Sequence, residues 1–148
     1  MRSKIINDAS EKTYVLILET GEEVISQLQR FAKENNLGAS RFTAIGAFSS
    51  ATLAYFNWEQ KDYETIPVNE QVEVLSLIGD VALQDGEPKT HVHVVVGKRD
   101  GSAHGGHLLQ AYVRPTLEII LIESPAYLRR IFDAESGLAL INIGSGEA

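Results

Sequence analysis

The chain has 148 residues, and its formal net charge is −7 because 20 aspartates and glutamates outweigh 13 lysines and arginines. This length is typical of one compact domain that folds without a disulfide or a structural metal. Apolar residues make up 44% of the sequence, which excludes a disordered chain. Cysteine is absent, which excludes disulfide frameworks, iron–sulfur clusters and thiol nucleophiles. The acidic balance opposes non-specific binding to nucleic-acid phosphates.

Targeting and membrane segments are not expected from the pattern of apolar residues. The basic residues near the start are followed by no apolar segment, so we expect no secretory signal. Aliphatic runs such as 119–122 extend over four residues, far below the length of a membrane span. We therefore expect a cytoplasmic protein.

The first predicted elements are a strand over residues 14–19 and a helix after it. The strand segment is an aliphatic run too short for a helix. Thr20 is expected to cap the helix, with Glu22 and Glu23 in the first turn, where carboxylates suit the helix dipole. Gly38 is expected to end it in a left-handed conformation. Apolar residues recur along it at helical spacing, namely Val24, Ile25, Leu28, Phe31 and Ala32.

The rest of the chain predicts mainly strands. Pro67 favours an edge position for the third of them, and Gly79 predicts a bulge in the fourth. Ser124 followed by Pro125 predicts a short helix over 126–132. The predicted strands cover residues 41–48, 52–58, 63–68, 72–83, 90–97, 107–113, 117–123 and 138–143.

This order of elements favours an α+β fold with a central antiparallel-rich sheet, one main helix and one short helix. We expect a single domain over residues 1–143 and a frayed tail over 144–148.

The four histidines, His91, His93, His104 and His107, all lie within 17 positions. In a strand over 90–97 the valines at even positions face one side, and His91 and His93 face the other. If His93 pairs opposite His107, three imidazoles converge, whereas a slip of one residue sends His107 to the valine face. His104 is expected to lie in the connecting loop, where its participation is optional.

Three neutral imidazoles suit zinc or another divalent transition metal, with one position left for water or a ligand. The sequence therefore predicts a metal site made of His91, His93 and His107. An alternative interpretation treats the same histidines as ordinary polar residues on a solvated strand face. Glu118 and Asp80 are candidates for a base that would activate metal-bound water, and both also fit a solvent-facing role. No catalytic triad or phosphate-binding loop accompanies them, so the sequence does not favour an enzyme.

Several motifs resemble the PPC (plants and prokaryotes conserved) domain family. They are Thr20-Gly-Glu-Glu-Val-Ile, Ala44-Ile-Gly-Ala-Phe, Thr90-His-Val-His-Val-Val-Val-Gly, Asp100-Gly, Gly105-Gly-His-Leu and Thr116-Leu-Glu-Ile-Ile. The resemblance extends to residue 143 and implies an α+β fold that assembles as a homotrimer. It places the family's histidines at His91, His93 and His107. Prokaryotic members commonly stand alone and are often described as DNA-binding, a description that comes from plant relatives with an AT-hook. This chain has no Arg-Gly-Arg core of such a hook.

Two classes of function follow from these observations. The first is a homotrimeric interaction or regulatory module with a divalent metal, associated with DNA weakly or through a protein partner. The second is a metal-dependent enzyme or small-molecule-binding protein that uses the open metal position. Strand segments such as 119–122 and 138–141 are apolar on both faces, which independently favours assembly with other copies. The absence of a substrate motif favours the first class.

Overall fold

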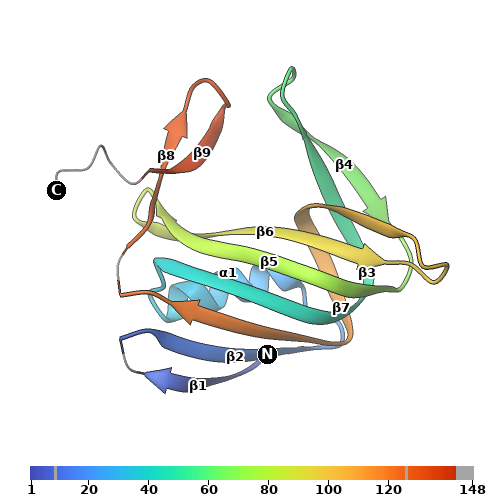
Figure 1. Ribbon diagram of the computed structural model, residues 1–148, viewed down its shortest axis with the longest axis horizontal. Coiled ribbons are helices and arrows are strands. Elements are labelled where there is room, and N and C mark those ends of the chain that lie inside the picture. The colour runs from blue at the N-terminus through green and yellow to red at the C-terminus, as the bar shows by residue number, and fades with distance from the viewer. Residues whose placement is uncertain (9, 126, 143–148) are drawn as a thin grey trace.

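The computed structural model describes residues 1–8, 10–125 and 127–142, and of residues 2–8 it describes the backbone. Within this part the chain forms strands and a single helix (Figure 1). The elements are β1 Arg2–Asp8, β2 Lys12–Glu19, α1 Val24–Glu34, β3 Ala39–Asn57, β4 Asp62–Val68, β5 Val72–Gln84, β6 Glu87–Gly97, β7 Ala103–Glu123, β8 Arg129–Asp133 and β9 Leu138–Asn142. In the same described part, no helix combines the length and the apolar character needed to cross a membrane.

The described strands form one nine-stranded sheet with the order β1-β2-β7-β3-β5-β8-β9. β4 is added to β3, and β6 pairs with β5 on one side and with β7 on the other. All pairings are antiparallel except the short contact between β5 and β8, so the sheet is mixed and antiparallel-rich. The prediction of a largely antiparallel sheet with one main helix is therefore confirmed, and β4 takes the predicted edge position.

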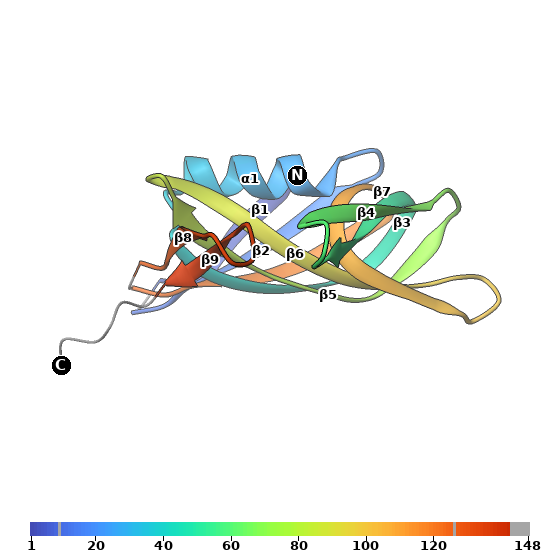
Figure 2. The ribbon, with the colours of Figure 1, turned by 90° about the horizontal axis from the view of Figure 1, so that it is seen from above.

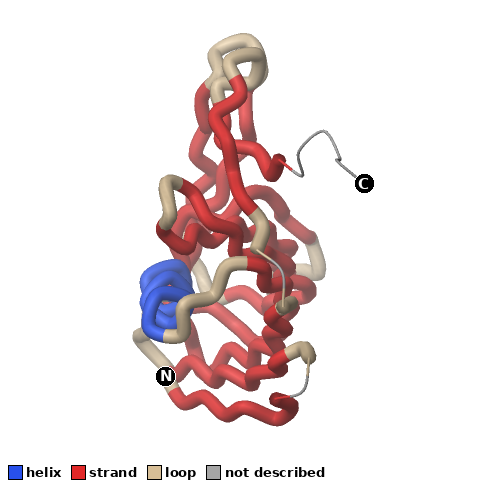
Figure 3. The backbone as a smooth tube through the Cα atoms, turned by 90° about the vertical axis from the view of Figure 1, so that its left-hand side faces the viewer, coloured by secondary structure: helices blue, strands red, loops and turns tan. Residues whose placement is uncertain are grey.

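α1 lies along one face of the sheet and covers the core (Figures 2 and 3). Its buried side chains follow the predicted apolar stripe and are Val24, Leu28, Phe31 and Ala32. The ring of Phe31 packs edge-on against Tyr14 at 5.2 Å between centroids. Each large apolar side chain buried in this way contributes about 1.5–3 kcal/mol. The buried valines of β6 belong to the same core cluster.

Both ends of α1 differ from the prediction. Glu23 is the N-cap, and its carboxylate accepts hydrogen bonds from the amides of Ile25 at 3.0 Å and Ser26 at 2.7 Å. Thr20 instead donates its hydroxyl to the carbonyl of Pro115 at 3.1 Å, so the predicted Thr20 cap is wrong. The first turn contains no acidic residue, because the predicted glutamates precede the helix.

The helix ends earlier than Gly38. Asn35 is the C-cap, and Asn36 adopts the left-handed conformation with φ of 52°. Asparagine tolerates this conformation better than most residues with a Cβ atom. At Gly38 a Cβ atom would lie 2.6 Å from Cδ1 of Tyr127, so this exposed ring would have to move to accommodate another residue.

Two pairs of predicted strands are single long strands. β3 runs through Ser49 and Ser50 without a turn, and β7 joins the segments predicted as 107–113 and 117–123. The pairing between β3 and β7 shifts register at several places while both strands continue, for example between Gly46 and Phe48. Because each long strand changes partners along its length, the sequence of one segment alone does not reveal its continuity.

Gly79 does not form the predicted bulge. The irregularity of β5 lies between Val74 and Ser76. A Cβ atom at Gly79 would overlap the ring of Phe42 and would lie 2.5 Å from the carbonyl oxygen of His91. Glycine is therefore needed there for the close approach of β5 to its neighbours.

The predicted short helix over 126–132 is wrong, because Arg129–Asp133 is strand β8. The backbone of Leu128 donates to the carbonyl of Gly38 at 2.9 Å and accepts from the amide of Leu83 at 2.8 Å. These bonds hold the chain extended beside β5, after which β8 pairs with β9. The predicted tail over 144–148 lies outside the described residues, and the domain boundary at residue 143 remains a prediction.

Candidate metal centre

The pairing of β6 with β7 positions the histidines. His93 lies directly opposite His107, which confirms the predicted register. Val92, Val94 and Val96 are buried in the core, so the histidines of β6 point to the face opposite α1. The strand alternation predicted from the sequence is thereby confirmed.

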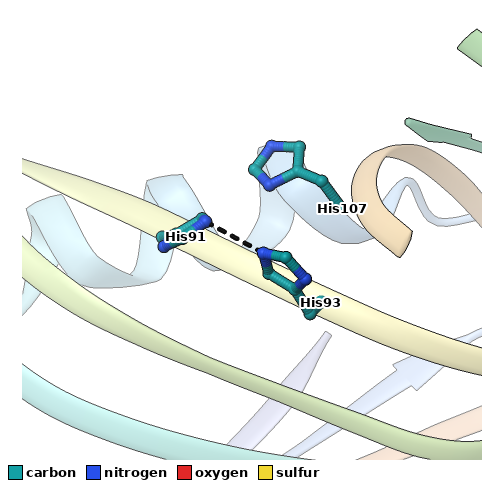
Figure 4. Close-up of side chains that lie close together, drawn as sticks. All are labelled: His91, His93 and His107. Carbon is teal, nitrogen blue, oxygen red and sulfur yellow. Dashed lines mark hydrogen bonds between the residues drawn. The ribbon is translucent and has the colours of Figure 1, made fainter. Parts of the chain in front are cut away.

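The three imidazoles converge from the two strands (Figure 4). His91 Nε2 lies 3.2 Å from His93 Nε2. One ring nitrogen from each of His91, His93 and His107 lies within 4.8 Å of the other two. The ring centroids are 4.9 to 5.4 Å apart. This grouping brings together the three histidines that the sequence nominated.

The cluster fits a divalent transition metal. Zinc–nitrogen bonds of about 2.05 Å in a tetrahedral arrangement separate the ligand nitrogens by about 3.3 Å. The His91–His93 separation already has this value, and a small inward movement of the His107 ring completes the set. Nδ1 of His107 is buried and has no hydrogen-bond partner among the described residues. An unsatisfied buried polar atom costs about 1–3 kcal/mol, and a bound metal removes this cost.

The surroundings favour the neutral form of two of the three imidazoles, those of His91 and His107. Burial, followed by the nearby His91 and His93, lowers the pKa of His107 to about 4. Burial also lowers the pKa of His91, and the charge of Arg130 lowers it further, while Asp80 opposes the shift. Because only a neutral imidazole donates its lone pair to a metal, both shifts prepare the site for metal binding at neutral pH.

Asp80 borders the cluster, whereas Glu118 does not. Asp80 lies opposite His91 in the β5–β6 pair, with Oδ2 3.9 Å from Nδ1 of the imidazole, and its other oxygen accepts a hydrogen bond from Arg130. Glu118 lies eleven positions beyond His107 on β7, opposite Ile17 and Ile45. Of the two carboxylates named from the sequence, only Asp80 is positioned to influence the histidines.

His104 is not in the predicted loop. It belongs to β7 and pairs with the buried Val96, so it lies on the other face from His107. It is also absent from the group of converging ligand atoms within the described chain. The structure therefore separates His104 from the other three histidines.

Two neighbours of the cluster were not predicted from the sequence. The ring of Tyr63 on β4 stacks on His107, with centroids 4.8 Å apart and an angle of 29° between the planes. Arg130 on β8 reaches Asp80 from a strand that the sequence predicts as a helix. The adjacent arginines at 129 and 130 were visible as a basic pair, but nothing local placed one of them beside His91.

The sequence profile of the Plants and Prokaryotes Conserved (PCC) domain matches residues 6–125, and the chain belongs to this family. A metal-containing protein from Archaeoglobus fulgidus has a similar structure with a TM-score of 0.83 and 35% identity, over 94% of this chain and 99% of that one. A structure described as a putative DNA-binding protein from Bacteroides thetaiotaomicron has a TM-score of 0.87 and 26% identity, over 95% and 96% of the two chains.

A curated relative is the bifunctional protein GlmU from Synechococcus sp., which is 32% identical over 128 residues. The match covers 85% of this chain and 19% of that protein. The chain therefore spans about a fifth of the length of this relative.

Proposed function

We propose that this protein is a metal-binding PCC-domain module in which His91, His93 and His107 hold one divalent ion, zinc by preference. The observation that carries the proposal is the convergence of three ring nitrogens from two paired strands, one of them buried without a partner in the described chain. The metal-containing relative from Archaeoglobus fulgidus supports it. A fourth coordination position would remain for water or a ligand.

Metal content and zinc titration of four alanine variants test this proposal. His91→Ala, His93→Ala and His107→Ala should each lower zinc affinity, because each removes one of the three ligands. His104→Ala is the matched control, because it removes a histidine of β7 from the opposite face. Equal zinc binding by all variants, or no binding by the wild type at neutral pH, would contradict the proposed site.

We also propose that the module assembles as a homotrimer. Ile78 and Ile120 both lie opposite Thr43, so they share the face of the sheet that α1 does not cover. These isoleucines are 55% and 43% exposed, and Ile45 and Leu75 line a groove of about 610 Å³ near them. Exposed apolar surface of this kind is typical of subunit interfaces.

Light scattering tests the assembly. A mass near three times 16.2 kDa is expected at micromolar concentration, and Ile120→Glu should lower it. A stable wild-type monomer would contradict the trimer.

The relatives described as DNA-binding raise DNA as a partner, and we propose that this chain contacts DNA weakly or through another protein. The supporting observation is the net charge of −7, which a trimer multiplies. Fluorescence titration at physiological salt should give weak binding with little sequence preference. Nanomolar, sequence-selective binding by the protein alone would contradict this proposal.

A binding role is preferred here to a catalytic one. Asp80 is engaged by Arg130, and Glu118 lies away from the histidines, so neither carboxylate is placed as a general base for metal-bound water.

A further inference from the structure

A pocket of about 240 Å³ lies beside the histidine cluster. His91 is common to both, so the pocket borders the proposed metal site, while His93 and His107 are not among its lining residues. Its lining residues come from five strands, β4, β5, β6, β8 and β9. The lining includes Tyr63 of β4, Lys89 and His91 of β6, Arg130 of β8, and Leu138 and Leu140 of β9.

The polar side of the pocket is cationic. Lys89 and His91 alternate on β6 and therefore share the same face. The Arg130 side chain is only 9% exposed, an unusual burial for a guanidinium. Nη2 of Arg130 donates to Asp80, and Nη1 donates to the carbonyl of Ala139 at 3.4 Å. A guanidinium has five N–H donors, so donors remain for a further acceptor.

The charges near the pocket favour an anion. Arg130 and Lys89 supply two positive charges. Asp80 neutralises part of the charge of Arg130, but Asp80 is not among the lining residues. A divalent ion at the histidines would add to this positive potential. A planar guanidinium matches the two oxygens of a carboxylate, and burial strengthens such a pair.

The opposite side of the pocket is apolar and partly open to solvent, and Leu140 is 44% exposed. Leu138 and Leu140 come from the β8–β9 hairpin, and Tyr63 comes from the β3–β4 hairpin, which projects on the same side of the molecule (Figure 1). The two hairpins meet, because Lys61 Nζ donates to the carbonyl of Ala134 at 3.2 Å. An occupant that fits these walls combines an anionic end with an apolar end.

We propose that this pocket binds a small organic acid, with its carboxylate held by Arg130 and Lys89 and its apolar part against Leu138 and Leu140. One contact in this inference rests on the proposed function, namely the contact between the carboxylate of the acid and the metal held by His91, His93 and His107. The pocket is smaller than those that hold drug-sized ligands, which confines the acid to a few carbon atoms. The open metal position and the pocket would then form one ligand site.

Calorimetric titration of the full chain, in metal-free and zinc-loaded forms, tests the ligand class. The probes are butyrate, the uncharged butyramide of similar shape, and inorganic phosphate. Butyrate should bind at least tenfold more tightly than butyramide, because charged hydrogen bonds to the carboxylate are lost in the amide. It should also bind more tightly than phosphate, which has no apolar part. Tighter binding of phosphate or equal binding of butyramide would overturn the assignment to an organic acid.

Substitutions then locate the site. Arg130→Gln should weaken butyrate binding at least tenfold, and Lys89→Gln should weaken it several-fold. Lys89 is exposed, so Lys89→Gln is expected to fold normally. This variant therefore tests the site even if Arg130→Gln proves unstable. Arg99→Gln is the matched control, because it removes a positive charge from the turn after β6, outside the pocket. Unchanged affinity in Lys89→Gln and Arg130→Gln would overturn the site.

The two forms of the protein separate this inference from the proposed function. Tighter butyrate binding with zinc supports contact between the carboxylate and the metal, and equal affinity overturns that contact. Failure of the wild type to take up zinc, with butyrate binding retained, would overturn the metal site and support the pocket. Zinc uptake without butyrate binding in either form would overturn the pocket and leave the metal site intact.

Discussion

Asp80 of β5 lies directly opposite His91 of β6, and its Oδ2 is 3.9 Å from Nδ1 of the imidazole. The other ring nitrogen, Nε2, is the atom that faces His93. A carboxylate beside Nδ1 favours the tautomer that carries its proton there, which leaves the lone pair of Nε2 directed at the cluster. At 3.9 Å the contact is electrostatic rather than a hydrogen bond, so we expect Asp80 to favour this tautomer of His91 without touching the metal.

Replacing this carboxylate should weaken metal binding. Asp80→Asn should lower zinc affinity about 10–100-fold, the usual effect of losing a partner that orients a metal-binding histidine. Glu118→Gln is the matched control, since this exposed strand carboxylate lies outside the cluster. Competition with a zinc-binding dye measures the zinc affinity of both variants. Equal affinities in the two variants would show that Asp80 does not orient His91.

The lowered pKa values predict that the metal-free protein loses stability between about pH 6.5 and 4. An unfolded histidine titrates near 6.5, whereas the pKa of His107 is about 4 in the folded protein. Between these values the unfolded chain binds a proton that the folded protein does not, so lowering the pH favours unfolding. The lowered pKa of His91 acts in the same direction.

Urea denaturation of the metal-free protein at several pH values measures this effect. His107→Gln should reduce the loss of stability between about pH 6 and 5, a window above the ordinary pKa of carboxylates. Stability that rises as the pH falls through this window would contradict the predicted sign. The same shifts should allow zinc to remain bound at a lower pH than an ordinary histidine site permits.

Removal of the metal should leave the protein folded. The core cluster lies on the α1 side of β6 and contains none of the three histidines. A chelator should therefore lower the melting temperature while the cooperative transition and the strand-rich circular dichroism remain. Loss of the cooperative transition on chelation would show that the metal is required for folding, as in a zinc finger.

The helix start offers a direct test of the capping residue. Glu23→Ala should lower the free energy of unfolding by about 1 kcal/mol, within the range of 0.5–2 kcal/mol for lost caps, because two amides of α1 lose their acceptor. Thr20→Ala should have the smaller effect, since its hydroxyl donates to Pro115 outside the helix. A larger effect at Thr20 would reverse this assignment.

Much of the site follows from local pattern. The alternation of valines and histidines places His91 and His93 on one side of β6, because successive strand residues face opposite sides. Burial of the valines determines which face of β6 packs against the core. The sequence alone did not fix which residue of β7 pairs with His93, since a register shift of one residue changes the face of His107. The hydrogen bonds of the β6–β7 pair decide it.

The main errors arise where long-range contacts override local preference. Ser124 and Pro125 are good helix-starting residues, yet Leu128 is bound by the backbone of Gly38 and Leu83, which makes β8 a strand. Gly79 resembles a bulge residue locally, but its small size serves the approach of Phe42 and of the His91 carbonyl. In both cases the competing contact comes from a distant part of the chain.

The sequence by itself determined the strand–helix–strand order and the shared face of His91 and His93, because these depend on residue type and on periods of two or a few residues, and its motifs identified the family. The pairing that brings His107 to them was decided by the register of β6 and β7. Only the tertiary structure decided that Asp80 rather than Glu118 borders the site, that His104 faces away, and that Arg130, Lys89 and Tyr63 surround a pocket beside His91. These relationships depend on strand register and on β4 and β8 lying near β6. Such proximity results from burial and pairing across the whole sheet, which no local segment encodes.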